Sequence, residues 1–485
     1  MTALHWQSAC TLSRAVQQRL LSPVELIEAT LQRISQWDPV VNAFILCDSA
    51  GARAAARQAE EEIASRHYRG PLHGMPIGLK DLIDVRGLAT TCHSRLRLNH
   101  KAAADAAVVT ELRRAGAIIV GKLSLHEFAL GGPSFDLPFP PARNPWNMEH
   151  HPGGSSSGCG AALAAGLLPL ALGTDTAGSI RHPASACGVV GFKPTYGLTS
   201  RDGVFPLAAT LDHVGPMARS VDDVALLLEA MAPPAHARPV GRPSPPGGRW
   251  LSMLAESLEL KGLRIGYVRH FHERDMPADP EVAAALDAVA AALIDAGASL
   301  TTVKLPDLKS FSAVSRVILQ SEGWATHASW LRERPQDYGK STRRRLLPGA
   351  FLSAEDYIRC QRARRVLIEA VQGVFREVDV LLCASAMDPA CRLDDVAALE
   401  STYARQARTP FNLTGHPAIA MMSGLSSAGL PLSVQFAGRY FDEATVLRVA
   451  KVWEAVGGWQ EHHPVRFDSG LDSASTPRPS AVCAG

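Results

Sequence analysis

The segment from 150 to 185, HHPGGSSSGCGAALAAGLLPLALGTDTAGSIRHPAS, most constrains what this chain can fold into. Two clusters of glycine and small hydroxyl-bearing residues stand on either side of an apolar stretch. A flexible linker needs no apolar partner, and a strand buried in a core needs no serines. We therefore expect LLPLAL to be a buried strand that leads into a tight turn, GTDTAGSIR.

The expected turn, 173–181, carries a serine near its end. Successive backbone N–H groups around such a turn can converge on one point, which makes an oxyanion hole beside a nucleophilic hydroxyl. An ordinary strand-to-helix turn contains the same small residues, so this segment alone leaves both interpretations open. The residues of the candidate hole are Thr176, Ala177, Gly178 and Ser179.

A serine nucleophile needs a base. The chain has 17 histidines, but no GxSxG elbow carries one of these serines. Lys80 offers an alternative because it lies inside the apolar segment MPIGLKDLIDV. Burial of an unpaired ammonium is costly and favours the neutral amine, which can accept a proton. A surface lysine would instead extend its charge into water, and that interpretation also stays open.

Three motifs taken together, GLKDL at 78–82, GGSSSG at 153–158 and GTDTAGSIR, resemble those of the amidase signature family. The resemblance runs from RLLSPVELIEATLQRI to FDEATVLRVAKVWE, and includes NPWN and TPFNLTGHPAIA. It implies a Ser-cisSer-Lys triad in which Ser179 is the nucleophile, Ser155 the bridging serine and Lys80 the base. It also implies a cis peptide between Gly154 and Ser155, and hydrolysis of a carboxylic amide through an acyl-enzyme on Ser179.

Further residues are expected to support this site rather than to react. Ser155 is preferred to Ser156 as the bridging residue because Ser155 aligns with the bridging serine of the family. Ser156, Asp175 and Arg181 are assigned supporting roles, the last two as braces of the turn.

The alternation of apolar strands with amphipathic helices predicts an α/β fold. The resemblance makes this the amidase signature fold, a central mixed, twisted sheet with helices on both faces. We expect an N-terminal helical part at 1–66 and a catalytic domain at 67–470, with a variable substrate-pocket region at about 306–400. A Pro- and Gly-rich linker is expected at 233–250, and a disordered tail at 471–485.

Composition excludes several classes of protein. The net charge of +2 provides no field that would recruit nucleic acid or an anionic membrane. The nine cysteines are scattered, with no CxxC, which argues against a disulfide framework or a zinc site. The longest apolar run is too short to span a membrane, and the first residues lack the order of a signal peptide. We expect a cytoplasmic enzyme, a monomer or homodimer, without metal or cofactor.

Two departures bear on the substrate. The glutamine-hydrolysing subunit of the tRNA-dependent amidotransferase, a member of the family, carries an aspartate seven residues before the Asn of PxNLxG, where this chain has Arg405. The polar loop of that enzyme is replaced by the apolar GGPSFDLPFPP. Arg344 and Arg345 still match its basic pair. These departures favour a stand-alone amidase over that subunit.

The substrate expected on this basis is a small-molecule amide, anilide or carbamate with apolar or aromatic groups. Phe128, Phe135 and Leu137, with Phe139, are candidate pocket residues, although simple packing explains them equally well. Trp324, Trp330 and Tyr338 lie in the variable region. A glutaminase-type subunit of an amidotransferase complex and a hydrolase of urea-like compounds are the alternatives.

Overall fold

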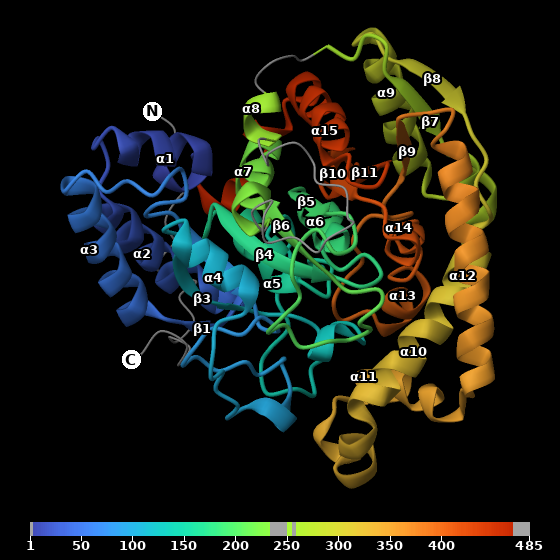
Figure 1. The fold of residues 1–485 in the computed structure, drawn as a ribbon, viewed down its shortest axis with the longest axis horizontal. Helices are drawn as coiled ribbons and strands as arrows, with labels where there is room; N and C mark the ends of the chain where they lie inside the picture. Colours follow the sequence, from blue (N-terminus) through green and yellow to red (C-terminus); the bar gives the residue numbers. More distant parts are fainter. Residues whose placement is uncertain (1–2, 233–249, 255–258, 469–485) are drawn as a thin grey trace, which may run out of the picture.

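The computed structural model describes residues 3–232, 250–254 and 259–468. Within these ranges one sheet of eleven strands forms the centre, in the order β1-β3-β2-β4-β6-β5-β10-β11-β9-β7-β8 (Figure 1). The expected tail at 471–485 and nearly all of the expected linker lie outside the described residues. The strands are β1 (Phe44–Cys47), β2 (Pro76–Lys80), β3 (Ile118–Leu123), β4 (Leu170–Asp175), β5 (Val190–Lys193), β6 (His213–Ala218), β7 (Arg264–Tyr267), β8 (Ser299–Thr302), β9 (Val380–Ala384), β10 (Ala418–Leu425) and β11 (Pro431–Gly438).

The sheet is mixed. Strand β2 runs parallel to β3 and β4, and β7 runs parallel to β8 and β9. The remaining pairs, including β4 with β6 and β10 with β11, are antiparallel. The expected α/β fold with a mixed sheet is therefore confirmed.

Both faces of the sheet are covered by helices. One core cluster takes residues from α1, α4, α7, α9 and α15, and a second takes them from α2, α3, α5 and α6. The helices are α1 (Ala9–Gln17), α2 (Pro23–Val41), α3 (Ser49–Ala64), α4 (Ala107–Arg114), α5 (Ser157–Ala164), α6 (Arg181–Cys187), α7 (Val221–Met231), α8 (Trp250–Leu254), α9 (Pro280–Asp295), α10 (Leu308–Glu333), α11 (Lys340–Leu346), α12 (Ala354–Val374), α13 (Val396–Ser401), α14 (Thr409–Thr414) and α15 (Glu443–Gly457).

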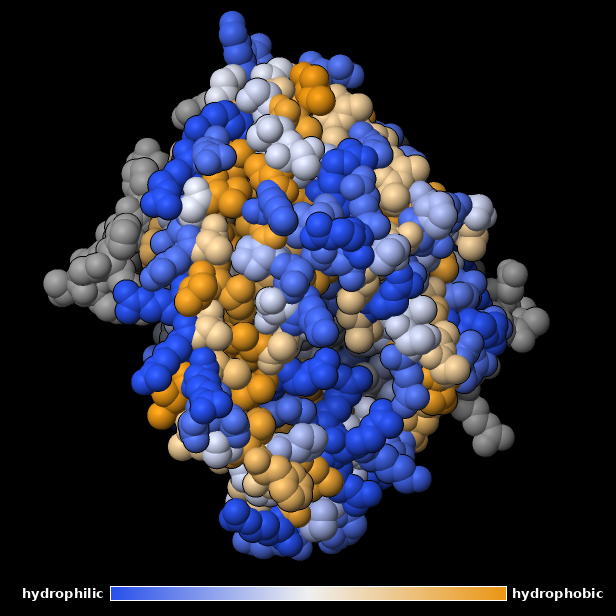
Figure 2. All heavy atoms as spheres, turned by 90° about the vertical axis from the view of Figure 1, so that its right-hand side faces the viewer, coloured by the Kyte–Doolittle hydropathy of each residue, from blue (hydrophilic) through white to orange (hydrophobic). Residues whose placement is uncertain are grey.

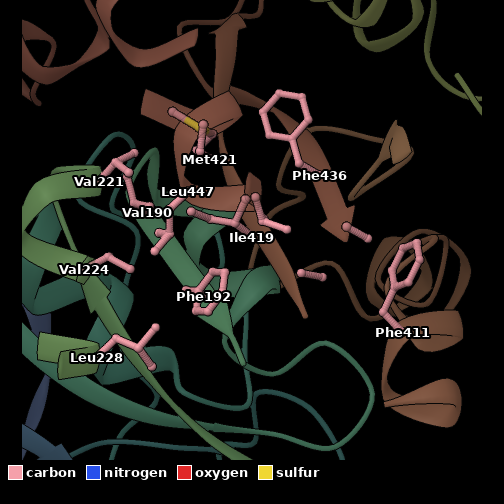
Figure 3. Packing of buried hydrophobic residues seen from close by; sticks show 14 of the residues in the cluster. Val190, Phe192, Val221, Val224, Leu228, Phe411, Ile419, Met421, Phe436 and Leu447 are labelled. Carbon is pink, nitrogen blue, oxygen red and sulfur yellow. The ribbon is translucent and has the colours of Figure 1, made fainter. Parts of the chain in front are cut away.

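Alternate residues of the strands contribute to opposite clusters, as the two-residue period of a strand requires. In β4, Leu170 and Leu172 belong to the first cluster and Ala171 to the second. Phe192 of β5 stands opposite Ile419 of β10, and Figure 3 shows both within the packed core. Apolar strands buried on both faces leave little room for polar side chains, so each buried charge in this sheet needs a specific explanation.

The N-terminal part differs in one respect from the expectation. Residues 3–66 are mainly helical, and Ser22 caps α2 with Pro23 at its first position. The segment also contains strand β1, which pairs antiparallel with β3 and so joins the central sheet. A strand of only four residues between two helices gives no clear two-residue period, which is why the sequence did not reveal it. The domain boundary at 66 stays a prediction.

Helices α10 and α12 lie together at the right of Figure 1 and pack on each other. Figure 2 shows that side of the molecule, where hydrophobic residues are interspersed with hydrophilic ones. The exposed apolar residues of this segment include Phe351, Ile358 and Val366. Because hydrophilic side chains interrupt them, this face resembles an ordinary protein surface.

A buried ion pair links β2 to β3 next to the end of β2. The Lys122 ammonium lies 2.7 Å from the Asp81 carboxylate, and neither side chain is exposed to solvent. Thr91 donates to the same carboxylate through its backbone N–H and its hydroxyl. The pair fixes the backbone directly after Lys80.

We predict that Asp81→Leu destabilises the fold by about 3–5 kcal/mol, because it leaves the Lys122 ammonium buried without its counter-ion. The double variant Asp81→Leu/Lys122→Met should regain part of that loss. Urea unfolding monitored by circular dichroism measures both. The single variant Lys122→Met completes the comparison. If the loss of stability in the double variant equals the sum of the losses in the two single variants, the coupling between Asp81 and Lys122 is contradicted.

Candidate functional site

Lys80, the last residue of β2, lies at the centre of the site. Its side chain is fully buried, and its Nζ donates to the Ser155 hydroxyl at 2.8 Å and to the Thr174 hydroxyl at 2.7 Å. Among the described residues it forms no ion pair with a carboxylate. The interpretation of Lys80 as a surface lysine is therefore wrong, and the buried interpretation is confirmed.

Burial also sets the protonation of this lysine. Removal of the ammonium from water lowers the pKa of Lys80 to about 7, which the more distant carboxylates of Asp175 and Asp212 only partly oppose. At neutral pH a large fraction of the side chain is consequently a neutral amine. Such an amine can accept a proton from the hydroxyl with which it is in contact.

The two neighbouring serines are distinguished by their partners. Ser155, which follows a cis peptide after Gly154, is bonded to Lys80. The Ser156 hydroxyl donates to the carbonyl oxygen of Thr174 at 3.1 Å and accepts from the Thr174 N–H at 3.3 Å. Only Ser155 thus contacts the lysine, and Ser156 ties α5 to the end of β4.

The second cluster places Ser179 beside the first. The Ser156 N–H donates to the Ser179 carbonyl oxygen at 3.1 Å, so the two serine segments touch through their backbones. Ser155 and Ser179 both line the same cavity. The apolar segment between them forms α5 and β4, which hold the two clusters at one end of the sheet.

The turn itself differs from the expected oxyanion hole at one residue. The Gly178 N–H donates to the Asp175 carboxylate at 2.6 Å, and the Ile180 N–H donates to the same carboxylate. Gly178 is therefore not free to hold an oxyanion in this arrangement. In the described part of the chain, the backbone N–H groups of Thr176, Ala177 and Ser179 make no hydrogen bond, and these remain the candidates.

Asp175 is held in turn by a buried network. The Arg181 guanidinium donates to its carboxylate at 3.0 and 3.1 Å, and the Asn412 amide donates to it at 2.8 Å. Arg181 also donates to Gln435 of β11. Burial raises the pKa of Asp175, but Arg181 and these hydrogen bonds outweigh that effect and hold it well below its usual range. The bracing contacts expected of Asp175 and Arg181 are present.

Sequence reasoning did not assign roles to Asn412 or Gln435. They lie more than 200 residues after the turn, so no local spacing connects them to it. Asn412 stands in the matched stretch TPFNLTG, which was the only signal that could have pointed to it.

The cavity at Ser179 has a volume of about 180 Å³. Burial holds the pKa values of His126 and His182 in its wall well below the usual range, so both imidazoles are neutral near pH 7. A wider cavity of about 570 Å³ meets it at Gly131, Arg345 and Tyr403, which line both. The inner wall consists of His126, Ala129, Leu130, Gly131, Gly154, Ser155, Thr176, Ala177, Gly178, Ser179, His182, Leu207, Leu319, Arg345, Tyr403, Ala404, Gln406 and Arg408.

The expected apolar pocket is not formed as predicted. Phe128 is fully buried and packs against His327 and Tyr338, away from the cavity wall, so the packing interpretation holds for it. Leu137 lies in a separate small cleft. Phe135 does line a cavity, but the outer one, and is 64% exposed. The backbone at Phe128 has a φ of 50°, which turns the chain in a way that side-chain periodicity does not predict.

The other residues that the sequence singled out lie in the core, in ion pairs or in a cavity wall. Trp330 and Tyr338 belong to, or pack on, the cluster around Phe128. Arg405 pairs with Asp388 at 2.8 Å and does not line the inner cavity. Arg345 lines it, whereas Arg344 pairs with Glu400 at 2.9 Å in the wall of the outer cavity.

Three further features concern all the residues that the structure describes. Within 3–232, 250–254 and 259–468, no group of three or more His, Cys, Asp or Glu side chains is placed to hold a metal ion. No disulfide joins the cysteines of these ranges. No helix in them is both long and apolar enough to cross a membrane.

A lysine, two serine turns and a mixed sheet in this arrangement define a class of C–N bond hydrolases. The family model described as Amidase matches residues 25–447, and the chain belongs to this family. It is 36% identical to a glutamyl-tRNA(Gln) amidotransferase subunit from Roseiflexus castenholzii, over 96% of this chain and 99% of that one.

Solved structures agree with the fold. The peptide amidase from Stenotrophomonas maltophilia has a TM-score of 0.82 and 29% identity, with 96% of this chain and 99% of that one covered. A 6-aminohexanoate cyclic dimer hydrolase complexed with substrate has a TM-score of 0.85 and 28% identity, with coverages of 96% and 100%.

These comparisons correct one expectation. The two substitutions at Arg405 and in the 131–141 loop suggested a chain distinct from the glutamine-hydrolysing subunit, but a whole-length relative at 36% identity carries the name of that amidotransferase. Similarity over the entire chain outweighs two local departures as evidence of relatedness. The departures still bear on which amide enters the cavity.

We predict that the reactivity of Ser179 follows the ionisation of Lys80. The rate of labelling by a fluorophosphonate should rise about tenfold per pH unit below pH 7 and level off above it, because only the neutral amine accepts a proton. Intact-protein mass spectrometry over time measures this rate. A rate that is constant from pH 5.5 to 8.5 would contradict the assignment, and Ser179→Ala is the control for labelling elsewhere.

Proposed function

We propose that this chain hydrolyses the C–N bond of a small carboxylic amide through an acyl-enzyme on Ser179. The observation that carries the proposal is the contact between the buried Lys80 amine and the Ser155 hydroxyl, beside a turn that presents Ser179 to a cavity. Membership of the Amidase family supports the same reaction.

The proposed reaction moves one proton back and forth. Ser179 attacks the carbonyl carbon and passes its proton to Ser155, whose own proton goes to neutral Lys80. In this proposal the N–H groups of Thr176, Ala177 and Ser179 stabilise the oxyanion. As the tetrahedral intermediate collapses, the proton returns through Ser155 to the leaving nitrogen. Water then attacks the acyl-enzyme, with Lys80 again accepting the proton.

The known relatives do not support the substrate hypotheses equally. The amidotransferase relative supports a glutaminase-type reaction that releases ammonia from a primary amide. An apolar or aromatic amide or carbamate has weaker support, because only Phe135 of the predicted pocket residues lines a cavity next to the site. The inner wall is instead rich in polar groups. We therefore favour a small polar primary amide.

We predict that Lys80→Met and Ser155→Ala each lower the turnover of a primary amide by about 10²–10⁴-fold, the usual contribution of proton transfer. Ser179→Ala should abolish turnover, and with it the hydroxamate formed when hydroxylamine traps the acyl-enzyme. Ammonia release and hydroxamate formation are the measurements. Full activity in the Ser179→Ala variant would contradict the proposal.

The same assay separates an independent enzyme from one component of a complex. The purified chain is offered glutamine, unsubstituted primary amides, anilides and aryl carbamates. Turnover by the chain alone supports an independent enzyme, and a preference for anilides would contradict the polar primary amide. Labelling of Ser179 without turnover of any of these would support a component that needs partner chains.

A further inference from the structure

Arg408 is an unusual residue of the inner cavity. Its side chain is 3% exposed, and only one of its nitrogens, Nη1, has a hydrogen-bond acceptor, the Ser385 carbonyl oxygen at 2.9 Å. Its Nε is buried without a hydrogen bond. In the described part of the chain this guanidinium has no carboxylate partner.

The position of Arg408 relates it directly to the reacting serine. A Cβ built on Gly178 would lie 2.6 Å from the Arg408 Nε, so the guanidinium lies against the backbone that precedes Ser179. Both residues line the same cavity as Ser179. A side chain at 178 would push Arg408 aside, which gives a packing reason for glycine there beyond its φ of 119°.

A buried guanidinium without a counter-ion is energetically unfavourable. Burial lowers the pKa of Arg408 to about 9, so the side chain remains charged near pH 7. By contrast, the equally buried Arg181 has the carboxylate of Asp175. Buried charges in proteins are normally paired, and a guanidinium left unpaired in a cavity is a recognition group for an anion.

The other charged side chain that lines the inner cavity has the same sign. Arg345 lies where the inner and outer cavities meet, and its side chain forms no ion pair among the residues described. The inner wall contains two arginines and no aspartate or glutamate. The two histidines in the wall, His126 and His182, are neutral near pH 7. The charged side chains that line the inner cavity are therefore cationic.

We infer that Arg408, assisted by Arg345, binds a carboxylate of the substrate, so that the site selects a monoamide of a dicarboxylic acid without an ammonium group. This inference rests on the proposed amide hydrolysis and adds the class of amide. A guanidinium provides two parallel N–H donors for a carboxylate. An ammonium group of the substrate would meet no carboxylate in the inner wall and would be repelled by both arginines.

The test compares matched substrates. The chain is assayed with malonamate, succinamate and glutaramate, with the neutral amides of equal length (propanamide, butanamide and pentanamide), and with glutamine, which is glutaramate with an added ammonium group. The best anionic amide should exceed its neutral counterpart in kcat/KM by roughly 10²-fold, the usual scale for a buried charge pair. Glutaramate should exceed glutamine. Equal rates for anionic and neutral amides, or a preference for glutamine, would overturn the inference.

Variants assign the selectivity to a residue. Arg408→Gln should remove most of the preference for the anionic amide, with Ser179 still labelled by the phosphonate. Arg408→Lys should restore part of the preference. Arg405→Gln is the matched control, because Arg405 lies three residues away, pairs with Asp388 and does not line the inner cavity. An unchanged preference in Arg408→Gln would contradict the assignment.

Two further measurements keep the outcomes separate. If Ser179 is not labelled by the phosphonate, the proposed function fails, whatever the preference among ligands. If the chain alone turns over none of the amides, calorimetric binding of succinamate and butanamide to the Ser179→Ala variant replaces the assay. Binding of the anion alone supports the inference, and equal or absent binding of both overturns it. If Arg408→Gln does not fold, the preference of the unmodified chain and of Arg345→Gln decides.

Discussion

The buried ion pair between Asp175 and Arg181 is the interaction on which the rest of the site depends. Asp175 ends β4 and Arg181 begins α6, so the pair spans the turn that carries Ser179. Asn412 and Gln435 connect the same pair to α14 and β11. Because an incomplete buried network is strongly unfavourable, these contacts hold the turn in one conformation. The turn residues that line the cavity, 176–179, are consequently fixed before any substrate arrives.

Three buried cations show how this sheet uses charge in different ways. Lys122 is compensated by Asp81 and serves the structure. Lys80 has only hydroxyl and carbonyl partners, so desolvation dominates and lowers the pKa of its amine to about 7. Arg408 stays charged because a guanidinium loses its proton far less readily than an ammonium. Similar burial thus gives a counter-ion pair, the proposed base and the proposed anion-binding group, according to the partners that the fold supplies.

The sequence predicted those parts of the site that depend on short segments. Lys80 in an apolar strand and the glycine-serine turns are local features, and their chemistry follows from a few neighbouring residues. Even a local contact can escape such an analysis. The Gly178 N–H donates to the Asp175 side chain, which lies only three residues away in the sequence. For Phe128 the sequence left pocket and core both open, and strand β1 was missed within a helical region. The burial of Phe128 and the pairing of β1 depend on contacts between distant segments, which neither periodicity nor composition encodes.

The choice of amide is decided by the wall of the cavity and not by the reacting groups. Relatives with this fold include a peptide amidase and a 6-aminohexanoate cyclic dimer hydrolase, so the fold alone does not specify a substrate. In this chain Arg405 is turned to Asp388, while Arg408 faces the cavity. The segment 403–408 follows α13 and is packed against the Ser179 turn through Gly178. In the proposed reaction, substitutions there would alter the charge near the scissile bond without touching Lys80, so the preferred amide would change while the proposed proton relay is kept.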